Sequence, residues 1–288
     1  LFFKLLCYKS ITPNDDAAFD FIKDYLSHYE HAIIDIEDTK NIFIYKKFGD
    51  GPHLSFAGHI DVVPPGDGWD TDPFEPTLKD GLVYARGTQD MKSGVCAFIQ
   101  AMKKTENFSG TLSAILTSDE EGEGTYGTIE VLKYLKEIDL LPDYAIVAEP
   151  TSEEKFGDAI KIGRRGSING YLEIKGKQGH AAYPEKSVNP ISLISPFLDK
   201  ITDYLFDEGD ENFAPSQLVV TDIRAGMEVT NVTPANLKMM FNVRNSTNTS
   251  KENIQDYIES LCKGLNFTLK LIQGSSPFVT CKDSYIVK

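Results

Sequence analysis

The sequence predicts an α/β protein in which a mostly parallel sheet carries helices on both faces, with a smaller α+β unit in its second half. Between residues 54 and 148, short apolar β-prone runs alternate with segments of helical periodicity. After residue 165 the order changes to strand, helix, strand, strand, helix, strand, which is the split ferredoxin-like pattern. Several predicted strands of the first half end in His, Asp or Glu, which gathers candidate functional residues at one sheet edge.

Apolar spacing and turn residues place the individual elements. In the first half, the expected helices are at 2–8, 17–27, 93–104 and 125–137, and the strands are at 33–36, 42–46, 54–56, 81–86, 111–117 and 144–148. In the second half, strands are expected at 169–175, 218–223, 237–243 and 267–272, with helices at 190–206 and 252–261. At 288 residues the chain is long enough for about two domains.

Charge and cysteine content disfavour several classes of protein. Lys and Arg number 29 and Asp and Glu number 43, so the net charge of −14 repels phosphate backbones and disfavours nucleic-acid binding. The cysteines are scattered without a close pair, which indicates a reducing compartment, the cytoplasm. No apolar run approaches membrane-spanning length, so no membrane partner is expected. The first residue is Leu rather than Met, and we expect the sequence to be a fragment.

A histidine and an aspartate lie two residues apart at the end of the strand predicted at 54–56. Side chains two apart on an extended backbone point the same way, so His59 and Asp61 share one face. An imidazole whose second nitrogen is held by an acid suits a metal ligand, because the acid fixes its tautomer and orientation. The alternative for a lone His-x-Asp is a surface histidine beside an unrelated acid.

Four further acids strengthen the metal interpretation. Glu120 and Glu121 follow one predicted strand, Glu149 follows another, and Asp90 ends a strand-to-helix loop. Ligands of open α/β sheets bind in the crevice outside the carboxyl ends of the strands. One histidine with several carboxylates at that edge predicts a site for zinc, or for two divalent ions that share a bridging acid.

The segment 122–127 matches the glycine pattern G-x-G-x-x-G between a predicted strand and a predicted helix. A dinucleotide site would need this backbone to hold a pyrophosphate. The surrounding acids Asp119, Glu120, Glu121 and Glu123 would repel a phosphate and attract a cation, so we disfavour nucleotide binding.

Longer motifs carry a resemblance to a known family. They are GHIDVVPPGDGW, ARGTQDMKSG, DEEG, AEP and GRRGSINGYLEIKGKQGHAAYP, in this order along the chain. With these motifs, the chain resembles the di-zinc aminoacylase and carboxypeptidase superfamily over essentially its whole length. The resemblance implies a metal-dependent amide hydrolase that acts on a small anionic substrate and holds two zinc ions per subunit, with cobalt as an alternative metal.

The resemblance also implies the metal ligands. His59, Asp90 and Glu149 would hold one zinc ion, while Asp90 and Glu121 would belong to the second. Members of the family often have a cis peptide after the bridging acid, which here is the Asp90–Met91 bond.

Two further residues near the metal receive catalytic roles from the resemblance. Asp61 would orient His59, and Glu120 would be the general base that activates water.

The second half would then be a lid and dimerisation domain. In the resembling family such a domain is inserted into the catalytic one, which gives a lid at residues 166–275 and a catalytic domain at 1–165 and 276–288. His180 would reach the active site of the partner subunit in a homodimer. Without the resemblance, a structural role for this histidine would be preferred.

Three arginines form a local basic exception in this acidic chain. They are Arg164, Arg165 and Arg244. The arginine fork binds carboxylates in a bidentate way, while the alternative is surface salt bridging. The resemblance assigns Arg164 and Arg244, with Asn231, to the substrate, and the arginine pair favours an acyl group that carries its own carboxylate.

Two alternatives remain open at this stage. One is a sibling amidohydrolase, such as an acetylornithine deacetylase or a dipeptidase, because motifs at the metal do not separate these enzymes. The other is a weakly active or non-catalytic fragment. Enzymes of the resembling family continue beyond the length of this sequence and carry a later histidine at the second zinc, and no histidine follows His180 here.

Overall fold

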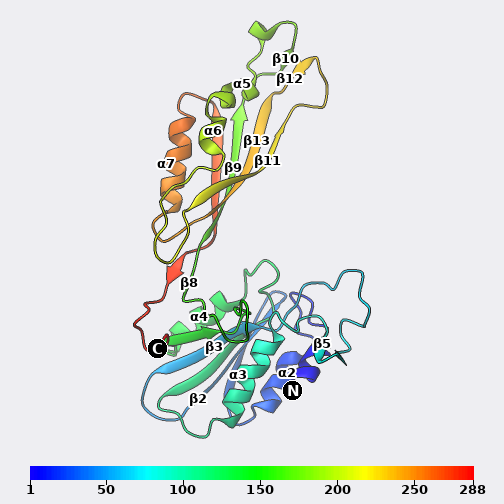
Figure 1. The fold of residues 1–288 in the computed structure, drawn as a ribbon, viewed down its shortest axis with the longest axis vertical. Coiled ribbons are helices and arrows are strands. Elements are labelled where there is room, and N and C mark those ends of the chain that lie inside the picture. Colours follow the sequence, from blue (N-terminus) through cyan, green and yellow to red (C-terminus); the bar gives the residue numbers. More distant parts are fainter. The chain divides into compact units, whose positions relative to one another are not determined.

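The computed structural model describes all 288 residues and divides into two compact units, Leu1–Ala159 and Ile160–Lys288 (Figure 1). Compared with the expected domain limits, residues 160–165 and 276–288 group with the second unit. The physical reason is a short ribbon in which β8 (Gly163–Arg164) pairs with β15 (Phe278–Val279). None of the helices is both long enough and apolar enough to span a bilayer.

A five-stranded sheet forms the centre of the first unit. Its strands lie in the order β1 (Glu30–Ile36), β2 (Thr39–Lys47), β6 (Thr111–Thr117), β3 (His53–His59) and β7 (Tyr144–Val147). The β1–β2 and β2–β6 pairs are antiparallel, whereas β6–β3 and β3–β7 are parallel. Only β2 therefore runs against the other four strands, which confirms the predicted mostly parallel sheet.

Helices cover both faces of this sheet, as predicted (Figure 1). Those on one face are α1 (Phe2–Leu6), α2 (Ala18–Tyr25) and α3 (Lys92–Lys104), and α4 (Thr128–Glu137) lies on the other. Along β6, Leu112, Ala114 and Leu116 belong to the core beneath α3, while Ile115 packs with α4. Successive side chains of a strand point to opposite faces, so one strand supplies both cores.

The parallel strands bring three chain segments to a common edge. His59 at the end of β3 is in register with Thr117 at the end of β6, and Ala57 is in register with Val147 at the end of β7. The segments after these strands therefore leave the sheet side by side. The strand expected at 81–86 is shorter and lies elsewhere, in a hairpin of β4 (Thr77–Lys79) and β5 (Leu82–Tyr84).

The second unit has a four-stranded antiparallel sheet in the order β11 (Gln217–Ala225), β13 (Asn236–Arg244), β9 (Ser167–Lys175) and β14 (Phe267–Ser275). Its core contains α5 (Pro190–Ile194), α6 (Leu198–Ile201) and α7 (Lys251–Leu261), which pack against alternate side chains of the strands. The order of these elements confirms the predicted ferredoxin-like unit. A small β10 (Gly179–His180) and β12 (Val232–Thr233) pair adjoins it.

The single long helix predicted at 190–206 is wrong. The structure has α5, then a 3₁₀ turn at Ser195–Phe197, then α6, and helical structure ends at Ile201. Pro196 lies inside this run, and a proline has no N–H to donate to the preceding turn. Asp203 then adopts a left-handed conformation with φ of 59°, which prevents continuation of the helix.

Candidate metal centre

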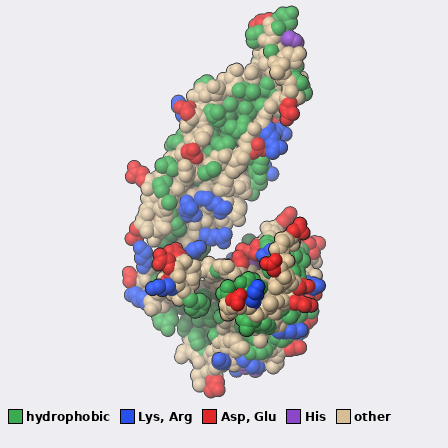
Figure 2. Space-filling view, turned by 45° about the vertical axis from the view of Figure 1, so that its right-hand side comes forward, with side chains coloured by type: hydrophobic (Ala, Val, Ile, Leu, Met, Phe, Trp, Pro, Cys, Tyr) green, Lys and Arg blue, Asp and Glu red, His purple; other side chains and the backbone are tan.

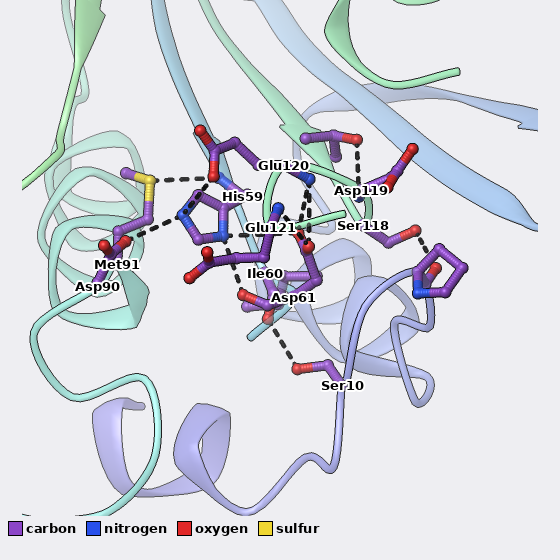
Figure 3. Close-up of polar contacts among 12 residues, drawn as sticks. Ser10, His59, Ile60, Asp61, Asp90, Met91, Ser118, Asp119, Glu120 and Glu121 are labelled. Atoms are coloured by element: carbon purple, nitrogen blue, oxygen red, sulfur yellow. Dashed lines mark hydrogen bonds and ion pairs between the residues drawn. The ribbon is translucent and has the colours of Figure 1, made fainter. Parts of the chain in front are cut away.

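Strand β3 places His59 at the carboxyl edge of the sheet with no exposed surface. Its Nδ1 lies 2.9 Å from the main-chain oxygen of Asp61, and its main-chain N–H donates to Met91 Sδ at 3.3 Å. Gly58 makes room for this sulfur side chain, because a Cβ at residue 58 would lie 2.6 Å from Met91 Cε. The ring is thereby held by its Nδ1 side, and its Nε2 faces a group of acids (Figure 3).

Three carboxylates approach His59 Nε2. The Oδ1 atom of Asp90 lies at 3.1 Å, Oε1 of Glu149 at 3.5 Å and Oε2 of Glu120 at 3.9 Å. They come from separate connections, after β5, β7 and β6 respectively. The structure therefore brings together residues that sequence analysis could place only at a common edge.

A close contact between α3 and the end of β7 explains why Asp90 and Glu149 meet. A Cβ at Gly94 would lie 2.2 Å from the main-chain oxygen of Ala148, so a larger residue cannot fit in this turn of α3. Asp90 immediately precedes α3, and Glu149 immediately follows Ala148. The Asp90–Met91 peptide is cis, which confirms what the resemblance implied.

The turn after β6 carries Glu120 and Glu121 beside this group. Their main-chain N–H groups donate to the fully buried carboxylate of Asp61, at 3.1 Å for Glu120 and 3.0 Å for Glu121. Before them, the Ser118 hydroxyl donates to the main-chain oxygen of Pro13 at 2.6 Å and accepts from Lys40 N at 3.0 Å. The turn is thus tied both to the N-terminal segment and to the strand that carries His59.

The clustered acids alter the electrostatics of the centre. Burial, with the neighbouring carboxylates, raises the pKa of Asp90, Glu120 and Glu121 above their ordinary values. Burial opposes a charge on His59, but hydrogen bonds to Asp61 and Glu149 outweigh it and raise its pKa to about 11.

Asp61 behaves differently from the other acids. Burial opposes its charge, but His59 and the N–H groups of Glu121 and Glu120 hold its pKa below the ordinary value. A carboxylate that already accepts these bonds is a poor metal ligand. We therefore interpret Asp61 as a residue that supports the metal ligands and is not a ligand itself.

Two overlapping groups of side chains could hold a metal ion. One contains His59, Asp90 and Glu121, the other contains His59, Glu120 and Glu149, and in each group the ligand atoms lie within 4.8 Å of one another. Repulsion between the carboxylates is consistent with a centre that a divalent cation would neutralise, and such a cation would take the place of a proton on His59. The donors present therefore fit a metal ion, and both groups share the same imidazole.

The remaining candidate residues lie in the second unit. His180 in β10 is exposed, and its Nδ1 accepts a hydrogen bond from Ala182 N at 3.1 Å. Asn231 precedes β12, and its main-chain oxygen accepts from Ala181 N at 2.9 Å. The β10–β12 pair therefore brings His180 and Asn231 together, although they are far apart in the sequence.

The three candidate arginines are exposed in the second unit. Arg164 lies in β8, Arg165 follows it, and Arg244 ends β13 opposite Gln217. Lys and Arg side chains gather on the surface of this unit toward β8 (Figure 2). Gly166 N donates to Asn245 O at 2.8 Å, so the residues that follow Arg165 and Arg244 meet along the main chain.

Sequence reasoning missed a buried lysine beside the centre. Lys92, two residues after Asp90, has no exposed surface, and its Nζ donates to the main-chain oxygens of Leu5 at 3.1 Å and Tyr8 at 2.9 Å. Burial lowers the pKa of Lys92 to about 8. Nothing in the local pattern Asp-Met-Lys-Ser distinguishes this lysine from an exposed one at a helix start.

Residues 55–288 match the peptidase family M20/M25/M40, which is more than half of the chain. The chain belongs to this family. The match covers His59, the Asp90 loop, the Glu120–Glu121 turn and the whole second unit, and thus every candidate residue described above.

Curated relatives are similar over the entire chain. A protein of Nautilia profundicola is 62% identical over 288 residues, which is 100% of this chain and 79% of the relative, and a protein of Aliarcobacter butzleri is 63% identical over 289 residues with the same coverage. Both relatives bear the name succinyl-diaminopimelate desuccinylase.

Solved structures of the family share the fold at low identity. An M20 metallo-carboxypeptidase from Sulfolobus solfataricus has a TM-score of 0.77 at 15% identity, covering 99% of this chain and 80% of its own. A dinuclear metal-binding M20 peptidase from Bacillus subtilis has a TM-score of 0.58 at 16% identity, covering 96% of this chain and 76% of its own. These likenesses show the fold and leave the substrate open.

Proposed function

We propose that this protein is a metal-dependent amide hydrolase that cleaves N-succinyl-LL-2,6-diaminopimelate to succinate and LL-2,6-diaminopimelate. The observation that carries the proposal is the identity of 62–63% across the whole chain to relatives named for this activity. Membership of the M20/M25/M40 family and the cluster of acids around His59 support the reaction type. Diaminopimelate places the reaction in lysine and cell-wall precursor synthesis.

The donor set supports zinc as the metal. One imidazole with carboxylates suits zinc, with cobalt as the alternative. We assign His59, Asp90 and Glu149 to one ion, and Asp90 with Glu121 to the second. When bound, such ions lower the pKa of water and polarise the scissile carbonyl.

Glu120 is the residue we assign as general base. Its Oε2 lies farther from His59 Nε2 than the nearest oxygens of Asp90 and Glu149, at 3.9 Å against 3.1 and 3.5 Å. It can therefore face a water molecule held among these groups without being a ligand itself. In the reaction, Glu120 accepts a proton from the attacking water and returns it to the leaving amine.

The second unit supplies the residues that we assign to the substrate. Arg164, Arg165 and Arg244 are exposed guanidinium groups that can bind carboxylates, and the succinyl group carries one. Asn231 and His180 are held next to each other and can donate hydrogen bonds to the acyl oxygen region.

A homodimer through the second unit is part of the proposal. Strand β11 is at the edge of its sheet and exposes Val219 and Ile223, and such an edge can pair with a second copy. Sedimentation of the purified protein tests the dimer. The four free cysteines support a reducing compartment, the cytoplasm.

One experiment separates this function from its sibling. Metal content is measured together with turnover of N-succinyl and N-acetyl substrates. Bound zinc with faster turnover of the succinyl substrate is the expected result. Preference for acetylornithine or a dipeptide would instead identify a sibling amidohydrolase, and metal without any turnover would indicate a binding role.

A further inference from the structure

The carboxylate of Asp61 is buried completely, and its hydrogen bonds define what it does. A buried carboxylate is costly unless donors surround it. Its Oδ2 accepts from Glu120 N at 3.1 Å and from Glu121 N at 3.0 Å, and its Oδ1 lies 3.3 Å from Glu120 N. Its distance to His59 Nδ1 is longer, at 3.5 Å. The shortest contacts of this side chain are therefore with the turn after β6.

The orientation of His59 depends on a different atom of the same residue. The His59 Nδ1 atom lies 2.9 Å from the main-chain oxygen of Asp61. This contact survives any substitution of the side chain at residue 61. The role implied by the resemblance, in which Asp61 orients His59, can therefore be met by the main chain, and the carboxylate is available for another task.

The Glu120–Glu121 turn needs such a partner. It follows β6 without helix or strand of its own, and the side chains of Glu120 and Glu121 sit among the like charges of Asp90 and Glu149. Repulsion between these carboxylates favours movement of the turn away from the centre. Two successive N–H groups that converge on one carboxylate form an anion-binding nest, which counters that movement.

Asp61 is itself held by the rest of the unit (Figure 3). On either side of it, Ser10 Oγ donates to Ile60 O at 2.7 Å, and Val62 N donates to Ser10 O at 2.9 Å. Ile60 N also donates to Thr117 O at 3.0 Å, at the end of β6. The carboxylate is consequently a fixed point against which a turn can be positioned.

We propose that the side chain of Asp61 is a positioning residue that fixes the Glu120–Glu121 turn through its two N–H groups, in addition to any effect on His59. It sets the distance of the base Glu120 and the ligand Glu121 from the strand that carries His59. The assignment of Glu120 as base rests on the proposed function, whereas the contact with the turn does not.

The variant Asp61→Asn tests the inference in the metal-loaded enzyme. An asparagine has the same shape but carries no charge, and its NH₂ group would replace either Oδ2, which accepts from both N–H groups, or Oδ1, which lies 3.3 Å from Glu120 N. We expect kcat to fall by roughly 10- to 100-fold with little change in KM. The affinity for the first zinc ion, measured by competition with a chromophoric chelator, should change much less than kcat.

Amide hydrogen exchange gives a readout that does not depend on turnover. In the unsubstituted protein, the amides of Glu120 and Glu121 should exchange slowly although they lie in an irregular turn. In Asp61→Asn they should exchange faster by roughly tenfold or more, as expected for loss of a hydrogen bond to a charged acceptor. Because the exchange is first measured without any substitution, a variant that fails to fold does not prevent the test.

Asp119→Asn is the matched control. Asp119 is buried in the same turn, and its carboxylate accepts a long hydrogen bond from the Thr39 hydroxyl at 3.5 Å. This variant removes a buried charge without touching the two N–H groups, so exchange at Glu120 and Glu121 should remain slow.

Two outcomes would overturn the inference. Fast exchange of both amides in the unsubstituted protein, or unchanged exchange in Asp61→Asn, would show that the carboxylate does not hold the turn. Loss of the first zinc ion in proportion to kcat would show that Asp61 acts through His59. Absence of turnover by the unsubstituted enzyme would count against the proposed function alone, and the exchange data would still decide the role of Asp61.

Discussion

In the first unit, the carboxylates of Asp90, Glu120 and Glu121 face one another around His59, whereas in the second unit the carboxylate of Asp207 faces only donors. The pKa of the three acids in the first unit is raised, mainly by burial and then by neighbouring acids. For Asp207 burial acts in the same direction, but hydroxyl and N–H donors outweigh it and hold its pKa well below the ordinary value.

The donors around Asp207 come from separate loops. Gly209 N at 2.8 Å and Ser216 N at 3.1 Å donate to Oδ1, while the hydroxyls of Ser246 at 2.8 Å and Thr249 at 2.6 Å donate to Oδ2. Every lone-pair direction has a partner, so Asp207 joins parts of the fold. The carboxylates of Asp90, Glu120 and Glu121 lack such hydroxyl and main-chain donors, and this difference separates a carboxylate that stabilises structure from carboxylates suited to a cation.

The largest effect expected from this comparison is the loss of rate in Glu120→Gln. The variant keeps the shape and should keep its zinc and its thermal stability, because the side chain is about half exposed. Removal of a general base costs roughly 10²- to 10⁴-fold in rate. Turnover and zinc content are measured on the same sample, with Glu123→Gln as an exposed control from the same turn. Loss of metal would move Glu120 into the ligand set.

Asp207→Asn should give the opposite result, a loss of stability without loss of metal. Hydrogen bonds to a charged group contribute about 1.5–3 kcal/mol each, and the amide keeps only some of the four, so we expect a loss of roughly 2–4 kcal/mol. Denaturant unfolding checks this, with the exposed Asp199→Asn as control. A loss below about 0.5 kcal/mol, the usual range for surface substitutions, would mean that this carboxylate does not join the loops.

The pH dependence should also differ between the units. The depressed pKa of Asp207 contributes stability that is present above its unfolded pKa of about 4 and is lost as the pH falls through the folded value. In the metal-free protein, the raised pKa values of Asp90, Glu120 and Glu121 have the opposite effect on stability. Their contribution is present below the unfolded pKa of about 4 and is lost as the pH rises through the folded values.

Unfolding curves with and without chelator, at acidic and neutral pH, separate these two terms. Zinc should abolish the loss of stability at neutral pH, and Asp207→Asn should abolish the loss of stability in acid. Identical pH profiles for metal-free and zinc-loaded protein would contradict the assignment of the acids in the first unit.

Zinc retention by the polypeptide of residues 1–288 should distinguish the two ligand sets assigned above, His59, Asp90 and Glu149 for one ion and Asp90 with Glu121 for the second. His59 is the only histidine in the candidate groups, so a second ion bound at the same time has carboxylates alone among these residues. After dialysis we expect about one tightly bound zinc ion per chain, because a catalytic zinc site needs three protein ligands and the second set provides two. Two retained ions would mean that another residue completes the second set.

The smallest effect is expected at Arg164. Lysine keeps the charge but loses the fork, so Arg164→Lys should reduce kcat/KM for the succinyl substrate by roughly tenfold, which corresponds to the lower end of the about 1.5–3 kcal/mol of one hydrogen bond to a charged group. The acetyl substrate, which lacks that carboxylate, should be affected less. Arg224→Lys is the control, because Arg224 is an exposed arginine of the same unit that pairs with Asp222 at 2.6 Å. Equal losses for both substrates would make Arg164 structural.

Patterns within one segment predicted much of the fold and of the centre. The strands that end near His59, Glu120 and Glu149 were placed because their apolar runs are short and end in turn residues. The helix expected at 190–206 failed because Pro196 stops it and Asp203 turns the chain, although the apolar spacing continues. A periodic pattern reports which face is buried, but it does not report where the backbone can continue as a helix.

Roles that depend on long-range contacts could not be predicted. The four donors of Asp207 come from positions up to 42 residues away. The acceptors of Lys92 are more than 80 residues away, and no local spacing links them. The same limit applies to Asp61, whose pairing with His59 is local while its contacts with the Glu120–Glu121 turn span about 60 residues.

The hydrogen bonds between Lys92 and residues 5–8 predict how the protein responds to proteolysis in this segment. The Lys92 ammonium depends on the main-chain oxygens of Leu5 and Tyr8 and has no exposed surface. Cleavage near Lys9 that released α1 would leave a buried cation without acceptors, two residues from Asp90. We therefore expect loss of this segment to weaken metal binding at Asp90, although the cut lies far from that residue in the sequence.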